Sequence, residues 1–282
     1  MRRLVVIALL GLAAAPAAAP AAPPPDWRPD VAAARELAAG RAGQVSFAVR
    51  TERGHWSHRG AVTYRSASVV KAMLLVAYLR RGDVRGRPLR AGERGLLDPM
   101  IRSSDNDAAT AISARVGTLA LSALGRRAGM RAFLPWPVWG GSRITADDQA
   151  RFFLRIDRLV PRRHRAYAMR LLRTVVPAQR WGIADAVPRG WTIAFKGGWG
   201  RGVTQQVDHQ VALLTNAGLR VSIAVLTADN PSDAYGEETQ RAIAALLLRG
   251  LAGEVRGEVV GGRAVLAQPS RDASSSSATG TP

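Results

Sequence analysis

Hydrophobic and polar positions follow three successive patterns along the chain. A helical segment rich in Ala and Leu at residues 31–42 precedes two stretches, 44–51 and 55–64, whose side chains alternate as in strands. Gly and Pro then separate a block of helical patterns, at residues 68–79, 96–103, 107–116, 119–128, 146–159 and 162–175. Three strand patterns follow, at residues 191–195, 210–215 and 220–227, and then a helical pattern at residues 237–251. This order predicts an α+β fold in which N-terminal and C-terminal strands share one sheet.

Both ends of the chain depart from this pattern. Residues 1–22 start with two arginines and an apolar run too short to span a bilayer as an ordinary helix, which is typical of a secretory signal peptide. Residues 23–30 read as a Pro-rich linker, and residues 269–282 as a Ser-rich, disordered tail. We therefore expect one folded domain over residues 31–268 and a secreted or extracytoplasmic location. An uncleaved signal that anchors the protein in a membrane is the alternative.

The chain is strongly basic, with 40 Lys and Arg residues against 21 Asp and Glu and a formal net charge of +19. Such a charge is typical of proteins that bind nucleic acid or an anionic surface. The arginines are spread along the chain without a long basic run, and no nucleic-acid motif accompanies them. We therefore predict no nucleic-acid partner and leave open peripheral contact with an anionic cell envelope.

Metal and cofactor chemistry has little support in the composition. The absence of Cys excludes disulfides, thiolate metal sites and a cysteine nucleophile. Histidines are few, and we expect them to be surface residues rather than metal ligands; they are His55, His58, His164 and His209. The sequence therefore predicts no metal and no cofactor.

Only two of the basic residues are lysines, Lys71 and Lys196. A lysine can lose its proton when it is desolvated, whereas an arginine stays charged. Lys71 is the one charged residue of an apolar helical segment, and Ser68 lies three positions before it on the same helical face. The pair is typical of a hydroxyl nucleophile with an adjacent amine base. The plainer alternative is that Ser68 caps the helix and Lys71 extends its amine to solvent.

Two further motifs follow this pair in the order of a known family. Ser104-Asp105-Asn106 lies between two helical segments, and Lys196-Gly197-Gly198 follows a predicted strand. The ordered set SxxK, SDN and KxG resembles the class A β-lactamase and penicillin-binding serine hydrolase superfamily. The resemblance implies a β-lactamase/transpeptidase-like α+β fold, with an antiparallel five-stranded sheet, flanking helices and a helical subdomain.

The resemblance also implies catalytic roles. Ser68 would be the acylated nucleophile and Lys71 its base or proton relay. Ser104 would pass the proton to the leaving nitrogen. Lys196 would lie at the edge of the cleft, where it orients Ser104 and attracts the carboxylate of the substrate.

Substrate-binding roles are implied in the same way. Asn106 would hydrogen-bond an amide side chain of the substrate, and the backbone N–H groups of Ser68 and Trp199 would form the oxyanion hole. Gly198 would let the strand approach the ligand closely. We expect Asp105 to turn the loop rather than to take part in the reaction.

Three departures from the family pattern bear on the reaction. The span from Ser68 to Ser104 is shorter than in typical class A enzymes, which implies that a helix or lid has been trimmed. Gly197 lacks the Thr or Ser hydroxyl that usually contacts the substrate carboxylate. No Glu occurs between Glu93 and Glu237, so the Ω-loop base that hydrolyses the acyl intermediate in class A enzymes is absent. An aromatic stretch over residues 135–141 takes its place and is better suited to walling a cleft than to holding water.

Other residues near these motifs have a structural explanation. We expect Asp147 and Asp148 to be first-turn acids of a helix capped by Thr145, in preference to a catalytic acid. Apart from Trp199, we attribute the tryptophans near the motifs to core packing in preference to a substrate wall; they are Trp136, Trp139, Trp181 and Trp191.

The sequence thus predicts a serine hydrolase that acts as a monomer on a small-molecule or cell-wall peptide-like substrate. It would form an acyl-Ser68 intermediate with a β-lactam or a peptide-like amide or ester, and release it slowly. One alternative is an acyl trap or sensor that never releases the adduct. The other is an arginine-rich binder of anionic polymer built on an inactive hydrolase scaffold.

Overall fold

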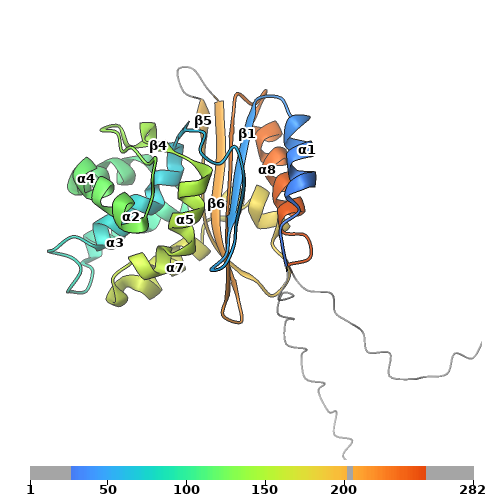
Figure 1. Ribbon diagram of the computed structural model, residues 1–282. Coiled ribbons are helices and arrows are strands. Elements are labelled where there is room, and N and C mark those ends of the chain that lie inside the picture. Colours follow the sequence, from blue (N-terminus) through green and yellow to red (C-terminus); the bar gives the residue numbers. More distant parts are fainter. Residues whose placement is uncertain (1–26, 202–205, 252–282) are drawn as a thin grey trace, which may run out of the picture.

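The computed structural model describes residues 27–201 and 206–251 (Figure 1). The predicted signal peptide, most of the linker and the predicted tail lie outside the described residues. The same holds for the C-terminal end of the predicted domain, from residue 252 onward.

A five-stranded antiparallel sheet forms the centre of the molecule, with the strand order β2-β1-β7-β6-β5. Its strands are β1 (Gln44–Arg50), β2 (His55–His58), β5 (Thr192–Arg201), β6 (Gln206–Asn216) and β7 (Leu219–Ala228). The pairing of β1 with β7 joins the N-terminal and C-terminal strands in one sheet, as the sequence predicts. A second, two-stranded sheet pairs β3 (Tyr64–Arg65) with β4 (Arg143–Ile144).

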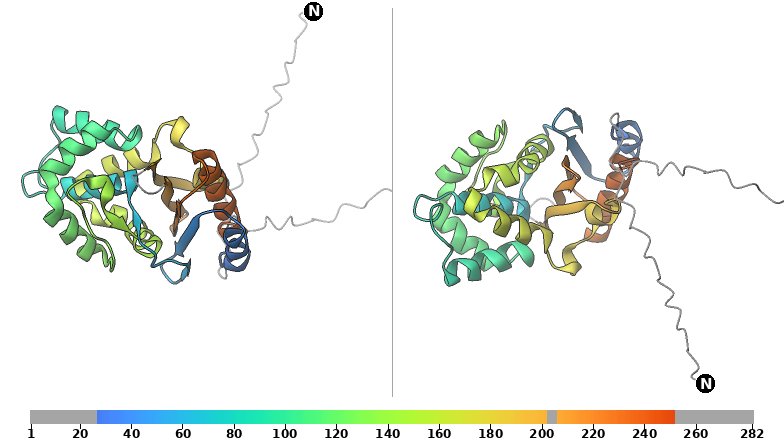
Figure 2. Two further views of the ribbon diagram at one scale, coloured as in Figure 1. Left: turned by 90° about the horizontal axis from the view of Figure 1, so that it is seen from above. Right: turned by 90° about the horizontal axis from the view of Figure 1, so that it is seen from below.

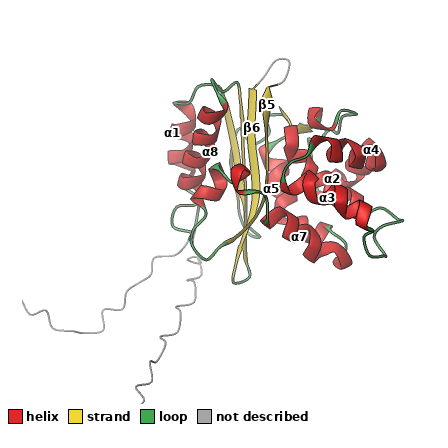
Figure 3. Cartoon of the chain, turned by 180° about the vertical axis from the view of Figure 1, so that it is seen from behind, coloured by secondary structure: helices red, strands yellow, loops and turns green. Residues whose placement is uncertain are grey.

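Helices cover both faces of the five-stranded sheet (Figures 1 and 3). One face carries α1 (Val31–Ala39) and α8 (Asp233–Leu247), and the other face carries the helical block. Two hydrophobic cores result: Phe47 of β1 belongs to the core under α1 and α8, and its neighbour Ala48 belongs to the core under the helical block. Because both faces are buried, the inner strands β1, β7 and β6 are buried along almost their whole length, whereas the edge strand β2 is half-buried or exposed.

The helical block lies to one side of the sheet in all views (Figure 2). It consists of α2 (Val70–Leu79), α3 (Ala91–Arg102), α4 (Asn106–Ala128), α5 (Ala146–Leu154), α6 (Ile156–Leu159) and α7 (Arg165–Arg173). Short 3₁₀ turns connect and flank these helices: η1 (Ala67–Val69), η2 (Trp139–Gly141), η3 (Arg162–His164), η4 (Pro177–Gln179) and η5 (Gly182–Ala186). Every residue of α2 is buried, which agrees with the all-round apolar sequence of this helix.

Helix α4 is long and apolar enough, by composition alone, to cross a membrane, but a third of that window is buried in the domain. It is interrupted at Gly117, whose φ of 71° and ψ of 164° are not helical. The interruption divides α4 at the point where the sequence predicts a break between residues 107–116 and 119–128. Each half packs within the folded domain, so we treat α4 as a helix of that domain.

Several element boundaries differ from the sequence prediction. The predicted strand 55–64 is wrong after His58, because the chain leaves the main sheet and only Tyr64–Arg65 returns as β3. Strand β5 extends to Arg201, well past the predicted end at residue 195. The extension holds Gly197, Gly198 and Gly200, and glycines carry no strand pattern.

Candidate active site

The turn that carries Ser68 is held at the start of α2. Ala67, directly before it, has a φ of 43°, an uncommon left-handed conformation for a residue with a side chain. The Ser66 backbone N–H donates to the Ser142 carbonyl at 2.7 Å, and the Ser66 hydroxyl contacts the Trp139 carbonyl at 3.3 Å. These bonds attach η1 to the segment before α5 and fix Ser68, which is half-buried, at the N-terminal end of the helix.

Lys71 lies one turn further along and is fully buried. Its Nζ donates to the Ser104 carbonyl at 2.5 Å, to Asn106 Oδ1 at 2.8 Å and to Ser104 Oγ at 3.2 Å. Burial lowers the pKa of Lys71 to about 8, and the negative charge of Asp105 opposes this effect. In the described residues, the hydrogen bonds of Lys71 reach the Ser104–Asn106 motif and none reaches Ser68, although the sequence predicts contact between these two residues.

Ser104 and Asn106 come from the junction of α3 and α4. Ser104 has a φ of 60°, so its backbone is held in the left-handed region. Asp105 is the N-cap of α4, where its carboxylate accepts from the Ala108 N–H at 2.7 Å. The structural role predicted for Asp105 is therefore confirmed. Backbone strain of this kind gathers at functional sites, where neighbouring contacts maintain it.

Lys196 enters from β5 and completes the cluster. Its Nζ donates to Ser104 Oγ at 3.0 Å and to the Gly197 carbonyl at 2.8 Å. The side chain is fully buried, and its contact with Ser104 is the one that the resemblance implies. Burial holds the pKa of Lys196 well below its ordinary value, and the positive charge of Lys71 lowers it further. The Ser104 hydroxyl thus lies between two lysines that both contact it.

Gly198 faces the nucleophile turn rather than open space. A Cβ atom at Gly198 would lie 2.6 Å from the backbone nitrogen of Val69 and 2.7 Å from that of Ser68. The strand backbone therefore passes directly against η1, which only glycine permits. The predicted close approach is present, but the partner is the turn that carries Ser68. Strand β5 is an edge strand, so alternate N–H groups of its backbone point away from β6.

Trp199 occupies the space beside Gly197. A Cβ atom at Gly197 would lie 3.4 Å from the Trp199 ring, and this ring packs edge-on against Trp181 with centroids 5.7 Å apart. The Trp181–Trp199 pair therefore lies next to Gly197, the position at which the family usually has a Thr or Ser hydroxyl. Core packing does not describe Trp181, which is only half-buried and packs against Trp199.

Trp139 lies over the ammonium group of Lys71, with Nζ 4.7 Å from the ring centroid. Its indole N–H donates to Thr110 Oγ1 of α4 at 3.2 Å, which fixes the ring. Core packing, the favoured explanation for the tryptophans, is wrong for Trp136, which is 54% exposed. Trp139 is half-buried and packs against the core under the helical block, as well as lying over Lys71. Core packing is correct for Trp191, which is buried. The expectation that residues 135–141 form a wall fits this arrangement.

Other candidate residues lie elsewhere. Asp147 contacts His55 at 2.7 Å, and Asp148 accepts from the backbone N–H groups of Arg131 and Ala132. Thr145 caps α5 as predicted. These contacts leave both acids with structural roles, as expected.

The surface location expected for the histidines is wrong for two of them. His164 and His209 are buried and bond the carbonyls of Val84 and Arg65. Within residues 27–201 and 206–251, no group of three or more His, Asp or Glu side chains is placed to hold a metal ion.

Comparison with known proteins gives a consistent result. The family model described as "Beta-lactamase enzyme family" matches residues 88–251, a range that includes the SDN and KxG motifs. No curated protein sequence matches this chain.

Solved structures of β-lactamases are similar in fold. The β-lactamase from Sphaerobacter thermophilus DSM 20745 is 23% identical, with a TM-score of 0.66, over 79% of this chain and 97% of its own. An ancestral class A β-lactamase is 17% identical, with a TM-score of 0.67, over 78% of this chain and 98% of its own. A β-lactamase from Xanthomonas campestris pv. campestris str. ATCC 33913 is 16% identical, with a TM-score of 0.67, over 79% of this chain and 97% of its own.

Proposed function

The chain belongs to the β-lactamase enzyme family, and we propose that it is a serine hydrolase that acts through an acyl-Ser68 intermediate. The main support is the position of the Ser104 hydroxyl, 3.2 Å from Lys71 Nζ and 3.0 Å from Lys196 Nζ. This hydroxyl connects the only two lysines of the chain beside the turn that carries Ser68. An arrangement of one nucleophile and two desolvated amines around a hydroxyl suits acyl transfer from an amide.

Acylation would begin when Ser68 Oγ attacks the carbonyl carbon of a β-lactam or of a peptide-like amide or ester. The Ser68 proton would pass to neutral Lys71, and the negative charge on the carbonyl oxygen would be stabilised by backbone N–H groups at the start of η1 and on β5. Ser104 would then deliver a proton to the leaving nitrogen, or to the leaving oxygen of an ester, and recover one from Lys71. The C–N or C–O bond breaks, and the acyl group remains as an ester on Ser68.

The two lysines would have different tasks in this step. If both donate to Ser104 Oγ, they fill the acceptor positions of that oxygen, and the Ser104 proton is free to point to the leaving group. Lys196 would orient Ser104 from its buried position and contribute positive charge beneath the carboxylate of a substrate. Asn106, which is exposed and bonded to Lys71, would contact an amide group of the substrate.

Release of the acyl group would be slow. The Glu that activates the hydrolytic water in class A enzymes is missing between Glu93 and Glu237, and the Trp139 ring covers Lys71 on one side. An indole ring cannot act as a base for water at neutral pH. A long-lived acyl-enzyme would result, and this favours an acyl trap or sensor as the second candidate function.

The setting of the activity is proposed from the sequence. The N-terminal segment supports a secreted or extracytoplasmic protein, whose substrates would be small molecules or cell-wall peptides. The net charge of +19 supports peripheral contact with an anionic envelope, and we propose a monomer.

Mass spectrometry with a labelled penicillin tests the proposal. The protein and its Ser68→Ala variant are incubated with the penicillin, and their intact masses are followed over time. An adduct that forms and decays supports the hydrolase, and a permanent adduct supports the trap. Equal labelling of the Ser68→Ala variant would remove Ser68 as the nucleophile for penicillin.

A broader panel covers other acyl donors. The same time course is run with a D-alanyl peptide and an activated ester. If no donor leaves an adduct or is cleaved, and the protein binds anionic polymer with a steep salt dependence, the arginine-rich binder becomes the leading explanation.

A further inference from the structure

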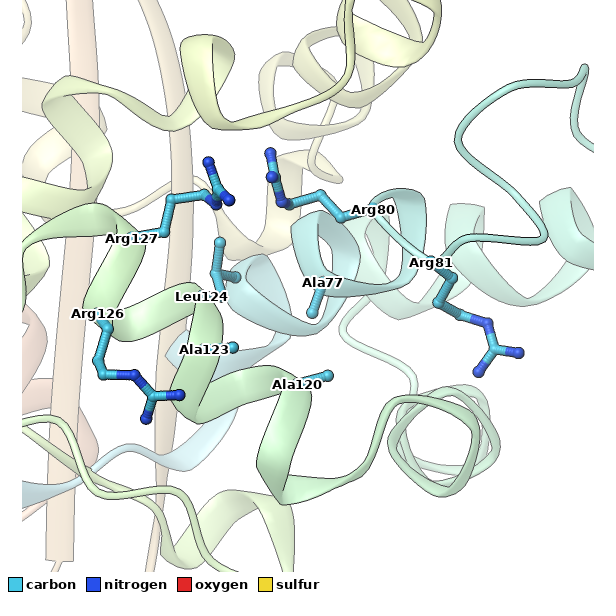
Figure 4. A pocket seen from close by; sticks show the side chains of 8 residues that line it. All are labelled: Ala77, Arg80, Arg81, Ala120, Ala123, Leu124, Arg126 and Arg127. Atoms are coloured by element: carbon cyan, nitrogen blue, oxygen red, sulfur yellow. The ribbon is translucent and has the colours of Figure 1, made fainter.

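A groove of about 680 Å³ lies at the far end of α2 from Ser68, between that end and the second half of α4 (Figure 4). Its lining is divided by chemistry, with apolar side chains on the floor and guanidinium groups around them. The lining residues are Ala77, Ala120, Ala123, Leu124, Arg80, Arg81, Arg126 and Arg127. Helix α2 rises about 1.5 Å per residue, so along its axis Ala77 lies about 9 Å and Arg80 about 13 Å from Lys71 of the catalytic cluster.

The arginines of the groove are short of negative partners. Arg81 is paired with Asp83 at 3.0 Å, but Arg80, Arg126 and Arg127 form no ion pair with any carboxylate in the described residues. Figure 4 shows the guanidinium groups of Arg80 and Arg127 turned towards each other. Like charges placed in this way repel each other, and a bound anion would remove the repulsion.

The surroundings of Arg80 strengthen this point. One of its nitrogens donates to the Leu159 carbonyl at 2.7 Å, which holds the side chain in place. Burial lowers the pKa of Arg80, and the charges of Arg127 and Arg85 lower it further, with no carboxylate opposing them. Arg80 therefore presents a fixed positive charge to the groove, with no carboxylate partner among the described residues.

We propose that this groove binds an organic phosphate, with the phosphate on the arginines and an apolar part on the Ala and Leu floor. Guanidinium groups bind phosphate through paired N–H donors, which favours this anion. The volume lies within the usual range of small-molecule sites. The site is separate from the catalytic cluster, and the proposal stands whether or not Ser68 is acylated.

Hexyl phosphate is a suitable probe because it joins a phosphate to a short apolar chain. Calorimetric titration of the full chain is expected to give tighter binding of hexyl phosphate than of inorganic phosphate or hexanol. The double variant Arg126→Gln/Arg127→Gln is expected to weaken binding at least about tenfold, as the loss of two charge-assisted contacts requires. The control Arg162→Gln/Arg163→Gln removes the same charge from exposed residues of η3 and is expected to stay within about twofold.

A second variant tests the groove without removing an arginine. Ala123→Glu places a carboxylate three and four positions before Arg126 and Arg127, where it can pair with them along the helix. The variant is expected to lose hexyl phosphate binding and to melt no lower than the wild type. Undiminished binding in Ala123→Glu, or equal weakening in the two double arginine variants, would overturn the proposal.

Vesicles distinguish the source of the phosphate. Binding to phosphatidylglycerol vesicles that is lost in Arg126→Gln/Arg127→Gln, but kept in Arg162→Gln/Arg163→Gln, identifies a lipid headgroup. Binding of hexyl phosphate without this vesicle effect identifies a soluble organic phosphate.

Discussion

The ammonium group of Lys71 lies 4.7 Å from the centre of the Trp139 ring, and the ring nitrogen is bonded to Thr110. An aromatic side chain thus covers the amine on one side. Replacement of Trp139 by Ala would admit water to this side of Lys71, next to an amine whose pKa is about 8. We expect the acyl-enzyme of Trp139→Ala to decay about tenfold faster than that of the wild type, because a positioned base near water accelerates hydrolysis. The decay of the adduct mass measures this rate.

Trp136→Ala is the matched control for that prediction. Trp136 belongs to the same loop but is 54% exposed, so its removal is expected to leave the adduct lifetime unchanged. An equal change in both variants would mean that loop mobility, rather than the cover over Lys71, sets the rate.

Gly198 and Gly197 are neighbours with different steric surroundings. A Cβ atom at Gly198 would lie within 2.7 Å of two backbone nitrogens of η1, whereas the nearest atom to one at Gly197 would be in the Trp199 ring, at 3.4 Å. Gly198→Ala is expected to destabilise the protein by about 1–3 kcal/mol and to abolish acylation, since β5 must move away from Ser68. Gly197→Ala is expected to retain both properties. Thermal unfolding and penicillin labelling compare the pair, and similar behaviour of the two variants would contradict the steric argument.

The arrangement of strands and helices could be predicted from the sequence because both faces of the sheet are covered. Apolar runs such as residues 220–227 and the all-apolar helix around Lys71 reflect burial that the structure confirms. Element ends were harder to predict. The glycines of β5 conceal half of that strand, and its pairing with β6 depends on contacts distant in sequence.

The site was predictable in its residues but less so in its contacts. The rarity of lysine singled out Lys71 and Lys196, which the structure brings together at Ser104. The cover provided by Trp139 could not be predicted, because it depends on how a loop about 70 residues away in sequence folds over η1. The full burial of Lys196 could not be predicted for a similar reason, since it depends on the contact of β5 with the turn at Ser104, 92 residues away in sequence.

Asp208 gives the stability of the protein a specific pH dependence. It is fully buried, one of its oxygens has no partner in the described residues, and burial raises its pKa to about 6. The pKa of Asp208 is near 4 in the unfolded protein, so between about pH 4 and pH 6 the folded protein holds one more proton than the unfolded protein. The free energy of unfolding therefore falls as the pH rises through this range and stays low above about pH 6. Asp208→Asn is expected to be more stable than the wild type by about 1–3 kcal/mol at pH 7.5 and equal to it near pH 4. Urea unfolding at both pH values tests this, and an equal difference at both would contradict it.

The acylation rate is expected to follow the protonation of Lys71. Only the neutral amine accepts the Ser68 proton, so the rate should rise with pH and level off above the Lys71 pKa of about 8. Asp105 raises this pKa, so Asp105→Asn should move the midpoint of the profile to lower pH while the Asn side chain still caps α4. Asp107→Asn, an exposed change one position beyond Asn106, is the control and should keep the wild-type profile. An unmoved midpoint in Asp105→Asn would exclude Lys71 as the group that controls the rate.

Ser104 combines a functional hydroxyl with an unfavourable backbone, and two substitutions separate these properties. Its φ of 60° is costly for any residue with a Cβ atom, by about 1–2 kcal/mol, and costs glycine little. Ser104→Gly is therefore expected to be more stable than Ser104→Ala by about 1 kcal/mol. Both variants lack the hydroxyl that joins Lys71 to Lys196, so both should be acylated about 100-fold more slowly or worse. Thermal unfolding gives the first comparison and labelling rates the second. Near-normal labelling of the Gly variant would show that the backbone conformation, and not the hydroxyl, is what acylation requires at this position.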